Sequence, residues 1–165
     1  MIRWARPADV EAIVRYVHEL ADYERLAHTC YATAEAMHEH LFGPKPSCEA
    51  LVAVADGAAQ EVVGFALFFQ AYSTFAPGPF LYLEDLYVTP RARGAGHGKA
   101  LLQALAAVAR ERGYPRVQWS VLEWNRPAIR FYEGLGARLL PDWRTCRAEG
   151  TEIDALAADA RAPAR

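Results

Sequence analysis

The amino-terminal hydrophobic positions predict a short strand followed by an amphipathic helix. Residues 2–6 form the strand, which Pro7 ends. From Asp9 onward, apolar side chains recur at intervals of three and four residues, so they fall on one stripe of a helix. The members of this stripe are Val10, Ile13, Val14, Val17, Leu20 and Ala21.

A second, shorter helix is predicted over residues 33–41. Thr33 suits the N-cap position, where its hydroxyl accepts a hydrogen bond from the first turn. Ala36 and Met37 are expected to face inward, and Gly43-Pro44 is expected to end the helix.

The middle of the chain alternates apolar stretches with turn residues, a pattern typical of strands. We predict strands over residues 50–55, 61–69 and 80–88. Asp56-Gly57 is expected to form the hairpin turn between the first two. Residues 62–83 carry no charge and are long enough to span a bilayer. The break at Pro77-Gly78-Pro79 favours two buried strands joined by a loop instead.

A helical stripe returns after Gly98, followed by another strand over residues 116–121. Gly113 is expected to end this helix. Its inward positions are expected to be Leu101, Leu102, Leu105, Ala106, Val108 and Ala109.

The carboxy-terminal part predicts one helix and two further strands. The helix covers residues 127–135, and Gly136 stands where a glycine just past a helix end belongs. Residues 137–140 and 151–156 predict strands, and about 158–165 are expected to form a frayed tail.

Size and composition indicate one ordinary globular domain over residues 1–165. The 165 residues suit a single domain, and 53% hydrophobic with 23% charged residues argue against intrinsic disorder. The 18 basic and 20 acidic residues leave a net charge of −2, which argues against a nucleic-acid partner. The order of elements predicts an α/β domain, with one mixed sheet and helices on its faces.

The number and spacing of the cysteines, together with the first ten residues, indicate the compartment in which the protein is expected. Cys30, Cys48 and Cys146 are odd in number and widely spaced, so neither a disulfide framework nor a zinc site is predicted. Charged residues interrupt the first ten positions, which argues against a secretory signal. We expect a soluble, reduced, cytoplasmic protein with no membrane partner and no metal.

A glycine-rich junction connects the strand at 80–88 to the following helix. Glycines alternate along Gly94-Ala95-Gly96-His97-Gly98, and the helix amino terminus adds about half a positive charge. With Arg93 and Lys99 on its flanks, the junction is suited to bind phosphate groups. A flexible strand-to-helix turn is the structural alternative.

Two common phosphate-binding motifs do not fit this junction. A Walker A loop needs glycine where Arg93 stands and serine or threonine where Ala100 stands. A dinucleotide-binding fingerprint needs glycine at the position of Lys99. ATP and NAD are therefore poor ligands for it.

Four segments together resemble the GCN5-related N-acetyltransferase (GNAT) superfamily. Arg93-Gly94-Ala95-Gly96-His97-Gly98 is similar to the superfamily's Arg/Gln-x-x-Gly-x-Gly/Ala pyrophosphate loop. The other segments are Leu81-Tyr-Leu-Glu-Asp-Leu-Tyr-Val88, Glu123-Trp-Asn-Arg-Pro-Ala-Ile-Arg-Phe-Tyr132 and Glu19-Leu-Ala-Asp-Tyr-Glu24. Over about residues 2–145, the chain resembles the diamine (spermidine/spermine) N1-acetyltransferases and their thialysine-acetylating relatives.

The resemblance implies a mostly antiparallel central sheet flanked by helices on both faces, and acetyl-CoA as co-substrate without a metal. Acetyl-CoA is expected to bind through its pyrophosphate at Arg93, Gly94, Ala95, Gly96, His97, Gly98 and Lys99, with further contacts from Asn125, Arg126, Pro127 and Ala128. The Leu86 N–H is expected to polarise the acetyl carbonyl, while Tyr87 and Val88 pair with the pantetheine arm as an added strand would.

Acetyl transfer to an amine requires a neutral amine and a proton for the departing thiolate. Neutralising an alkylamine at pH 7 costs about 4.6 kcal/mol, so a carboxylate near the amine is useful as proton acceptor. The resemblance gives this role to Glu84, directly or through water; a salt bridge at the strand end is the alternative. Asp85 is expected to point to the opposite face. Tyr132 matches the family's proton donor, with a purely structural core tyrosine as the alternative.

The resemblance places the amine acceptor among acidic and aromatic side chains, which suit a cation. These residues are Tyr23, Glu24, Glu84, Gln118, Trp119, Ser120 and Asp142. Thr74 and Ala76 stand where the polyamine enzymes have an acid and a tryptophan. This departure disfavours spermidine and leaves a short diamine, a thialysine-like amino acid or another small amine open.

Two other functions stay open at this stage. A non-catalytic acyl-CoA-binding sensor needs residues 93–99 but neither Glu84 nor Tyr132, and both are present. A GNAT enzyme acting on a protein or peptide amine is the second alternative. A purely structural domain leaves the joint presence of the four segments unexplained. The resemblance also implies a homodimer.

Overall fold

The computed structural model describes residues 1–55, 57 and 60–158, and the chain divides into two compact units at residues 124 and 125. The larger unit, Met1–Trp124, carries a five-stranded sheet in the order β1-β2-β3-β4-β5. Its strands are β1 (Ile2–Trp4), β2 (Glu49–Val54), β3 (Val62–Ser73), β4 (Gly78–Val88) and β5 (Val117–Gln118). Every neighbouring pair is antiparallel except β4 and β5, which are parallel. The mixed, mostly antiparallel sheet is confirmed.

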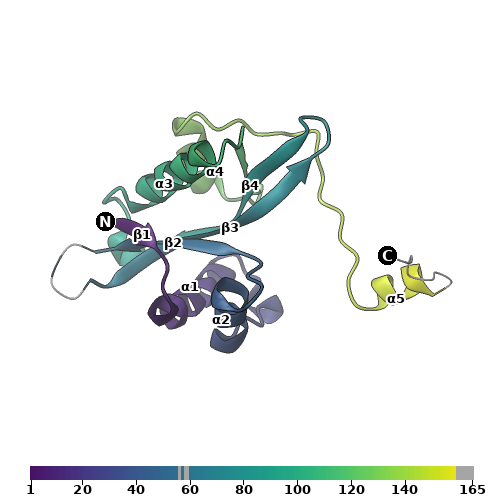
Figure 1. The fold of residues 1–165 in the computed structure, drawn as a ribbon, viewed down its shortest axis with the longest axis horizontal. Helices are drawn as coiled ribbons and strands as arrows, with labels where there is room; N and C mark the ends of the chain where they lie inside the picture. The colour runs from purple at the N-terminus through teal and green to yellow at the C-terminus, as the bar shows by residue number, and fades with distance from the viewer. Residues whose placement is uncertain (56, 58–59, 159–165) are drawn as a thin grey trace. The chain divides into compact units, whose positions relative to one another are not determined.

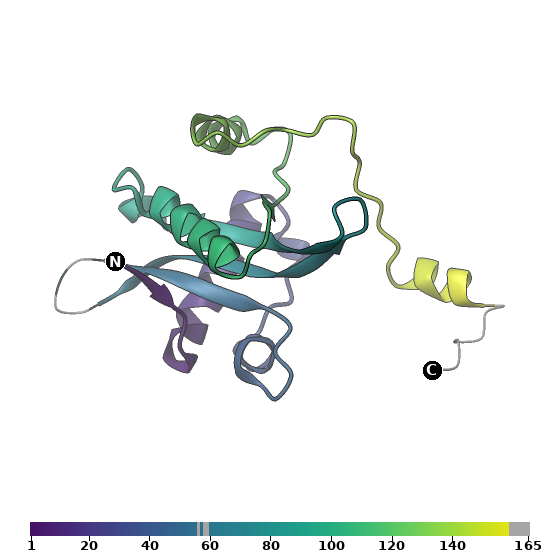
Figure 2. The same cartoon turned by 45° about the horizontal axis from the view of Figure 1, so that its top comes forward.

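Helices cover both faces of this sheet (Figures 1 and 2). The helices α1 (Val10–Tyr23) and α2 (Ala34–Phe42) lie on one face, and α3 (His97–Glu111) lies on the other. Strand alternation separates two cores accordingly, because Val52 packs with α1 and Leu51 with α3. Short 3₁₀ turns at Pro7–Asp9, Ala27–Thr29 and Pro90–Ala92 connect the elements.

The helical predictions hold at most positions. The Thr33 hydroxyl accepts the Ala36 N–H at 3.2 Å, as an N-cap does. Ala36 and Ala106 are exposed, so their predicted inward orientation is wrong: each lies about 100° around its helix from a buried or half-buried neighbour. The stripe on α1 also missed Tyr16, which is 1% exposed because its hydroxyl is satisfied by the Val62 carbonyl at 2.6 Å.

The charge-free run is confirmed as two strands, β3 and β4, that pair along their length. Both are longer than predicted, since β3 continues to Ser73 and β4 begins at Gly78. Asp56 of the predicted β2–β3 turn lies outside the described residues. Across the described part of the chain, the helices are all too short or too polar to cross a membrane.

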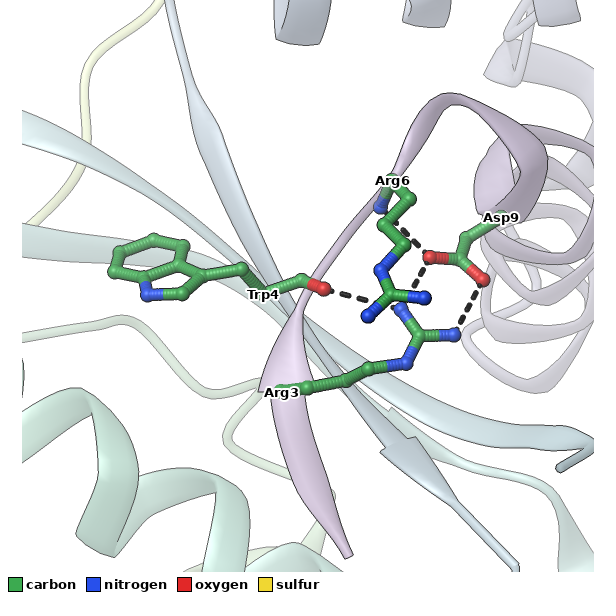
Figure 3. A network of polar contacts seen from close by, with 4 residues as sticks. All are labelled: Arg3, Trp4, Arg6 and Asp9. Atoms are coloured by element: carbon green, nitrogen blue, oxygen red, sulfur yellow. Dashed lines mark hydrogen bonds and ion pairs between the residues drawn. The ribbon is translucent and has the colours of Figure 1, made fainter.

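A polar network fixes the amino-terminal strand to the start of α1 (Figure 3). Asp9 is only 6% exposed and accepts hydrogen bonds from both Arg3 amino groups, at 2.6 and 2.9 Å. The Arg6 backbone N–H donates to the same carboxylate at 2.7 Å. This pairing offsets the cost of burying the charges and orients α1 against the sheet.

The smaller unit begins at Asn125 and contains α4 (Arg126–Gly134) and α5 (Thr151–Ala157). The Asn125 side chain accepts the Ala128 N–H at 3.3 Å and caps α4, and Gly136 follows its end with φ +89°.

Three strand predictions in the carboxy-terminal third need correction. Residues 137–140 are irregular, and residues 151–156 lie in α5. Glu152 and Asp154 stand in the first turn of α5, where negative charge favours a helix. The predicted strand at 116–121 is reduced to β5. The tail prediction lies outside the described residues from 159 onward.

Candidate functional site

The strand β4 contains a β-bulge at Glu84. Leu67 of β3 pairs with Asp85, and its neighbour Phe68 pairs with Leu83, so Glu84 is the extra residue of β4. A bulge of this kind locally bends a strand and disturbs the alternation of its side chains.

The bulge changes which residues of β4 face α1. Before it, Leu83 is buried in the core on the α3 side. After it, Leu86 packs against that same core, whereas Tyr87 belongs to the core on the α1 side. Odd-numbered positions thus face α3 before the bulge and α1 after it. Both Glu84 and Asp85 are therefore directed to the α1 side.

The acidic cluster, defined as Glu24, Glu84 and Asp85, follows from this geometry. Burial and the negative charges of Glu84 and Glu24 raise the pKa of Asp85 to about 6. Burial also raises the pKa of Glu24, which lies at the carboxyl end of α1. Because these carboxylates interact, the prediction that Asp85 points away from Glu84 is wrong. Strict alternation does not survive the bulge.

Within the described residues, the acidic cluster has no ion pair with an arginine or lysine of the chain. Glu84 is exposed, while Glu24 and Asp85 are half-buried. Like charges held together in this way bind a cation or share a proton, because either relieves their repulsion. The cluster is therefore suited to an ammonium group.

The carboxyl half of β4 is an open edge of the sheet. β4 pairs with β5 only at Leu81 and Tyr82, and among the described residues no strand pairs with residues 83–88 on that side. Backbone N–H and C=O groups along this edge are available to an extended ligand.

The hydrogen-bond register identifies which backbone groups point to the open edge. The Thr89 N–H donates to the Val63 carbonyl at 3.0 Å. Thr89 and Val63 are therefore a hydrogen-bonded pair in the antiparallel ladder that continues β3 and β4. Two residues earlier, Tyr87 directs its N–H and C=O to β3 as well. The backbone groups of Leu86 and Val88 therefore face the open edge, whereas those of Tyr87 face β3. The predicted contacts of Leu86 and Val88 with acetyl-CoA stay predictions, and this register does not favour the predicted pairing of the Tyr87 backbone.

The glycine-rich junction adopts the conformation that only glycine takes readily. Gly94 and Gly96 have φ of +81° and +83°, and Gly96 is the N-cap of α3. The first turn of α3 contains no acidic side chain. The N–H groups of His97, Gly98 and Lys99 have no partner within the helix, so they are suited to bind an anion.

Arg93 points from the junction toward the aromatic residues on the α1 side. Its Nε donates to the Val88 carbonyl at 2.9 Å, and its guanidinium lies 5.6 Å from the Tyr87 ring and 5.7 Å from the Tyr23 ring. The Tyr87 hydroxyl donates to Glu19 at 2.8 Å. Burial, together with the hydrogen bond and charge of Glu19, raises the pKa of Tyr87 to about 12.

Two further residues, Trp124 and Arg25, extend the group of aromatic and arginine side chains around Tyr23. Neither was assigned to a site from the sequence. The Trp124 ring lies 5.8 Å from the Tyr23 ring, and the Arg25 guanidinium lies 5.7 Å from the Trp124 ring. Trp124 lies in residues 123–132, one of the segments that carried the family resemblance, and this position could have marked it as a candidate site residue. Nothing in the sequence pattern distinguished Arg25.

The predicted residues around β5 divide between the two faces. Gln118 pairs with Tyr82 in the ladder, and the Ser120 hydroxyl lies 2.9 Å from the Tyr82 hydroxyl. Trp119 packs against the core on the α3 side. Trp119 is therefore not brought to the acidic cluster.

The remaining predicted residues lie in the smaller unit. Tyr132 is half-buried on α4, with its ring 5.3 Å from that of Phe131. Arg126 and Pro127 are exposed at the start of α4, and Asp142 is exposed in the irregular segment that follows the helix. Their roles stay predictions.

Comparison with known proteins identifies relatives of the chain. Residues 14–137 match the model of the acetyltransferase (GNAT) family. A thialysine N-epsilon-acetyltransferase from Mus musculus is 38% identical over 164 residues, which cover 94% of this chain and 96% of that protein. An L-ornithine N5-acetyltransferase from Arabidopsis thaliana is 30% identical, with 94% of this chain and 86% of that protein covered.

A solved structure supports the fold. An integron cassette protein from the mobile metagenome of V. cholerae superposes with a TM-score of 0.77 at 25% identity. The superposition covers 95% of this chain and 96% of that chain. The overall fold is thus shared along nearly the whole length.

Proposed function

The chain belongs to the acetyltransferase (GNAT) family, and from this premise we propose that it transfers an acetyl group from acetyl-CoA to a small cationic amine. The reacting group is a primary amine, which attacks the thioester directly while both substrates are bound. The related thialysine and ornithine acetyltransferases support a small acceptor, because both named substrates carry a primary amine on a short side chain.

The acidic cluster beside the open edge of β4 is the observation that carries this proposal. Glu84 and Asp85 immediately precede Leu86, whose backbone faces the open edge. An ammonium held by the carboxylates would therefore lie next to a thioester whose pantetheine arm follows Leu86 and Val88. Holding both reactants together in this way reduces the entropic part of the barrier.

The residues of the junction fit acetyl-CoA. Its pyrophosphate would be held by the N–H groups of His97, Gly98 and Lys99, with the Lys99 ammonium adding positive charge. Gly94 and Gly96 leave space for the phosphates, since a Cβ atom at either position would meet no protein atom within 4 Å. Bound acetyl-CoA supplies the activated acetyl group.

Each chemical role falls to a group of this chain. A carboxylate of the acidic cluster, Glu84 by family resemblance, removes the proton that leaves the amine. The Leu86 N–H donates to the carbonyl oxygen as it gains negative charge. Tyr132 donates a proton to the departing thiolate. None of the three cysteines is needed for a covalent step.

A panel of amines tests the proposal. The purified protein is incubated with acetyl-CoA and putrescine, ornithine, thialysine, spermine or an acetylatable peptide, and CoA release is followed. Release with the small cationic amines supports the proposal. Tight acetyl-CoA binding without release would indicate a sensor, and release only with the peptide would indicate a protein-acetylating enzyme.

A further inference from the structure

The residues that precede the acidic cluster on β4 extend the same face of the sheet. Leu81 and Leu83 are buried in the core on the α3 side, so Phe80 and Tyr82 point to the α1 side, as Glu84 does. We call Glu84, Tyr82 and Phe80 the β4 row. Because alternate residues of a strand are about 7 Å apart, Tyr82 lies about 7 Å and Phe80 about 14 Å from Glu84 along the strand.

The middle of the β4 row is aromatic and carries hydroxyl groups. Phe69 of β3 pairs with Tyr82, and their ring centroids lie 5.3 Å apart. The Ser120 hydroxyl lies 2.9 Å from the Tyr82 hydroxyl. Phe69 and Tyr82 are half-buried and lie outside both cores. Ring faces and hydroxyl oxygens of this kind suit an ammonium group.

The far end of the β4 row carries a positive charge. The Arg116 guanidinium lies over the Phe80 ring, with 4.0 Å between its central carbon and the ring centroid. The backbone also fixes Arg116 beside β4, because its carbonyl accepts the Leu81 N–H at 3.3 Å. Across the part of the chain that the structure describes, no carboxylate forms an ion pair with Arg116. The row therefore runs from negative charge at Glu84 to positive charge at Arg116.

The far end of a cationic acceptor held at the acidic cluster is expected to follow the β4 row. In the opposite direction along the strand, Tyr87 is buried in the core on the α1 side. At the carboxyl end of α1, the Arg93 guanidinium lies 5.7 Å from the Tyr23 ring and would repel a second cation. Tyr82 offers an uncharged, half-buried surface instead.

We propose that Arg116 limits the length of the acceptor by repelling any cationic group that reaches Phe80. The inference rests on the proposed function and names a residue that selects among cationic amines. Putrescine reaches only Tyr82, because bond lengths place its two ammonium groups about 6 Å apart. Spermine extends past Phe80 and carries further ammonium groups to the guanidinium. Repulsion between like charges discriminates against such a ligand as a steric clash does.

Putrescine and spermine isolate this effect, because both present a primary amine and differ in how far they reach. We expect the wild-type kcat/KM to be about tenfold or more higher for putrescine than for spermine. In Arg116→Gln, kcat/KM for spermine is expected to rise about tenfold through a lower KM, whereas kcat/KM for putrescine changes by less than about twofold. Steady-state kinetics with saturating acetyl-CoA measure both amines.

Two further variants separate charge from packing. Arg116→Lys keeps a positive charge at Phe80, so it is expected to keep the wild-type preference for putrescine. Arg15→Gln is the control for net charge, because the Arg15 guanidinium also lies over a ring, 5.0 Å from that of Tyr16, but in contact with the core on the α1 side. Its ratio of kcat/KM values is expected to equal that of the wild type.

The outcomes distinguish this inference from the proposed function. An unchanged ratio in Arg116→Gln overturns the role of Arg116 alone, since the wild type still acetylates small amines. An equal gain for spermine in Arg116→Lys would attribute the effect to packing and overturn the role of the charge. A wild-type enzyme equally active on both amines also overturns it. If the wild type acetylates no small amine at all, the proposed function itself fails, and this inference fails with it.

Discussion

Asp85 is an acid whose environment disfavours its own charge. Its pKa is about 6 in the folded protein against an ordinary value of 3.8. The folded state therefore retains a proton that the unfolded state loses, and stability falls as the pH rises through the interval from about 4 to 6. At pH 8 this difference costs the folded state on the order of 3 kcal/mol.

We predict that Asp85→Asn raises the melting temperature more at pH 8 than at pH 5, because asparagine carries no charge to bury. Thermal unfolding followed at both pH values measures the effect. Asp9→Asn is the control, because it is expected to lower the melting temperature at pH 8 instead of raising it. Burial acts against its charge, but hydrogen bonds from Arg3 and Arg6 lower the pKa of Asp9, so removing that charge destabilises the fold at pH 8. An equal change in the melting temperature of Asp85→Asn at pH 5 and pH 8 would contradict the conclusion that the buried charge of Asp85 destabilises the fold.

The same carboxylate predicts the pH dependence of activity. Asp85 is half charged at about pH 6 and gains the rest of its charge as the pH rises further, and the acidic cluster attracts an ammonium best when it is charged. We expect kcat/KM for a cationic amine to rise through a pKa near 6 and this rise to be lost in Asp85→Asn. Glu84→Gln is expected to lower kcat/KM by about tenfold or more at all pH values. A profile unaltered in Asp85→Asn would exclude Asp85 from binding the amine.

Tyr132 provides a separate test of the chemical step. Tyr132→Phe keeps the ring on α4 but removes the hydroxyl, so we predict a kcat lower by about 10²-fold with an unchanged KM for acetyl-CoA. Phe131→Leu is the neighbouring control, since it alters the ring contact with Tyr132 without touching the hydroxyl. Wild-type kcat in Tyr132→Phe would show that another group protonates the thiolate.

At the residue scale, sequence reasoning identified groups by matching motifs and missed those defined by geometry. Glu84 and the glycine junction were singled out in this way, and their roles stay predictions. Asp85 was misdirected because strict alternation was assumed, whereas the three-residue spacing between Leu83 and Leu86, which pack against the same core, marks the bulge. The stacking of Arg25 on Trp124 was not predicted, because residue type reveals neither a positive φ nor a stacked guanidinium.

At the scale of elements, the two ends of α3 offer a matched experiment. Gly96 and Gly113 have φ of +83° and +70°, and a Cβ at either would meet no protein atom within 4 Å. A substitution at either therefore introduces similar backbone strain. Gly96 lies at the proposed pyrophosphate site, whereas Gly113 lies at the opposite end of α3.

We predict that Gly96→Val raises the KM for acetyl-CoA by about tenfold or more, because its side chain occupies space that the phosphates need and strains the N–H donors. Gly113→Val is expected to lower stability to a similar degree while leaving this KM unchanged. Steady-state kinetics and thermal unfolding of both variants measure the two effects. Equal KM values in the two variants would remove the site from the junction.

Helices and strands with a clear hydrophobic period, or with a recognisable residue at a helix end, were predicted well. Elements that lack both features were not. The apolar stripe of α1 and the Thr33 cap of α2 specified their helices, and Gly136 marked the end of α4. Residues 151–156 have no clear hydrophobic period, so the short apolar run there fitted a strand and a helix equally. β5 pairs with β4 only before the bulge, at Leu81 and Tyr82, and this limit set by a neighbouring strand is not visible in the sequence of residues 116–121.

For the whole molecule, both cores are built from residues up to Trp119. Beyond α4, large apolar side chains are exposed among the described residues: Leu139, Leu140, Trp143, Ile153 and Leu156. Trp143 is 75% exposed and Leu156 is 76% exposed. A second copy of the chain would remove this apolar surface from water, and the family resemblance implies a homodimer.

We therefore predict a sedimentation mass of twice the chain mass of 18.3 kDa at micromolar concentration. Replacing Leu140 and Trp143 together by serine is expected to halve that mass, because the exposed apolar area drives association. Tyr31→Ser is the control, since Tyr31 is 84% exposed in the larger unit and should leave the mass unchanged. A wild-type mass of 18.3 kDa would refute the dimer. A dimer that persists in the double variant would place the interface elsewhere on the chain, since association would then need neither Leu140 nor Trp143.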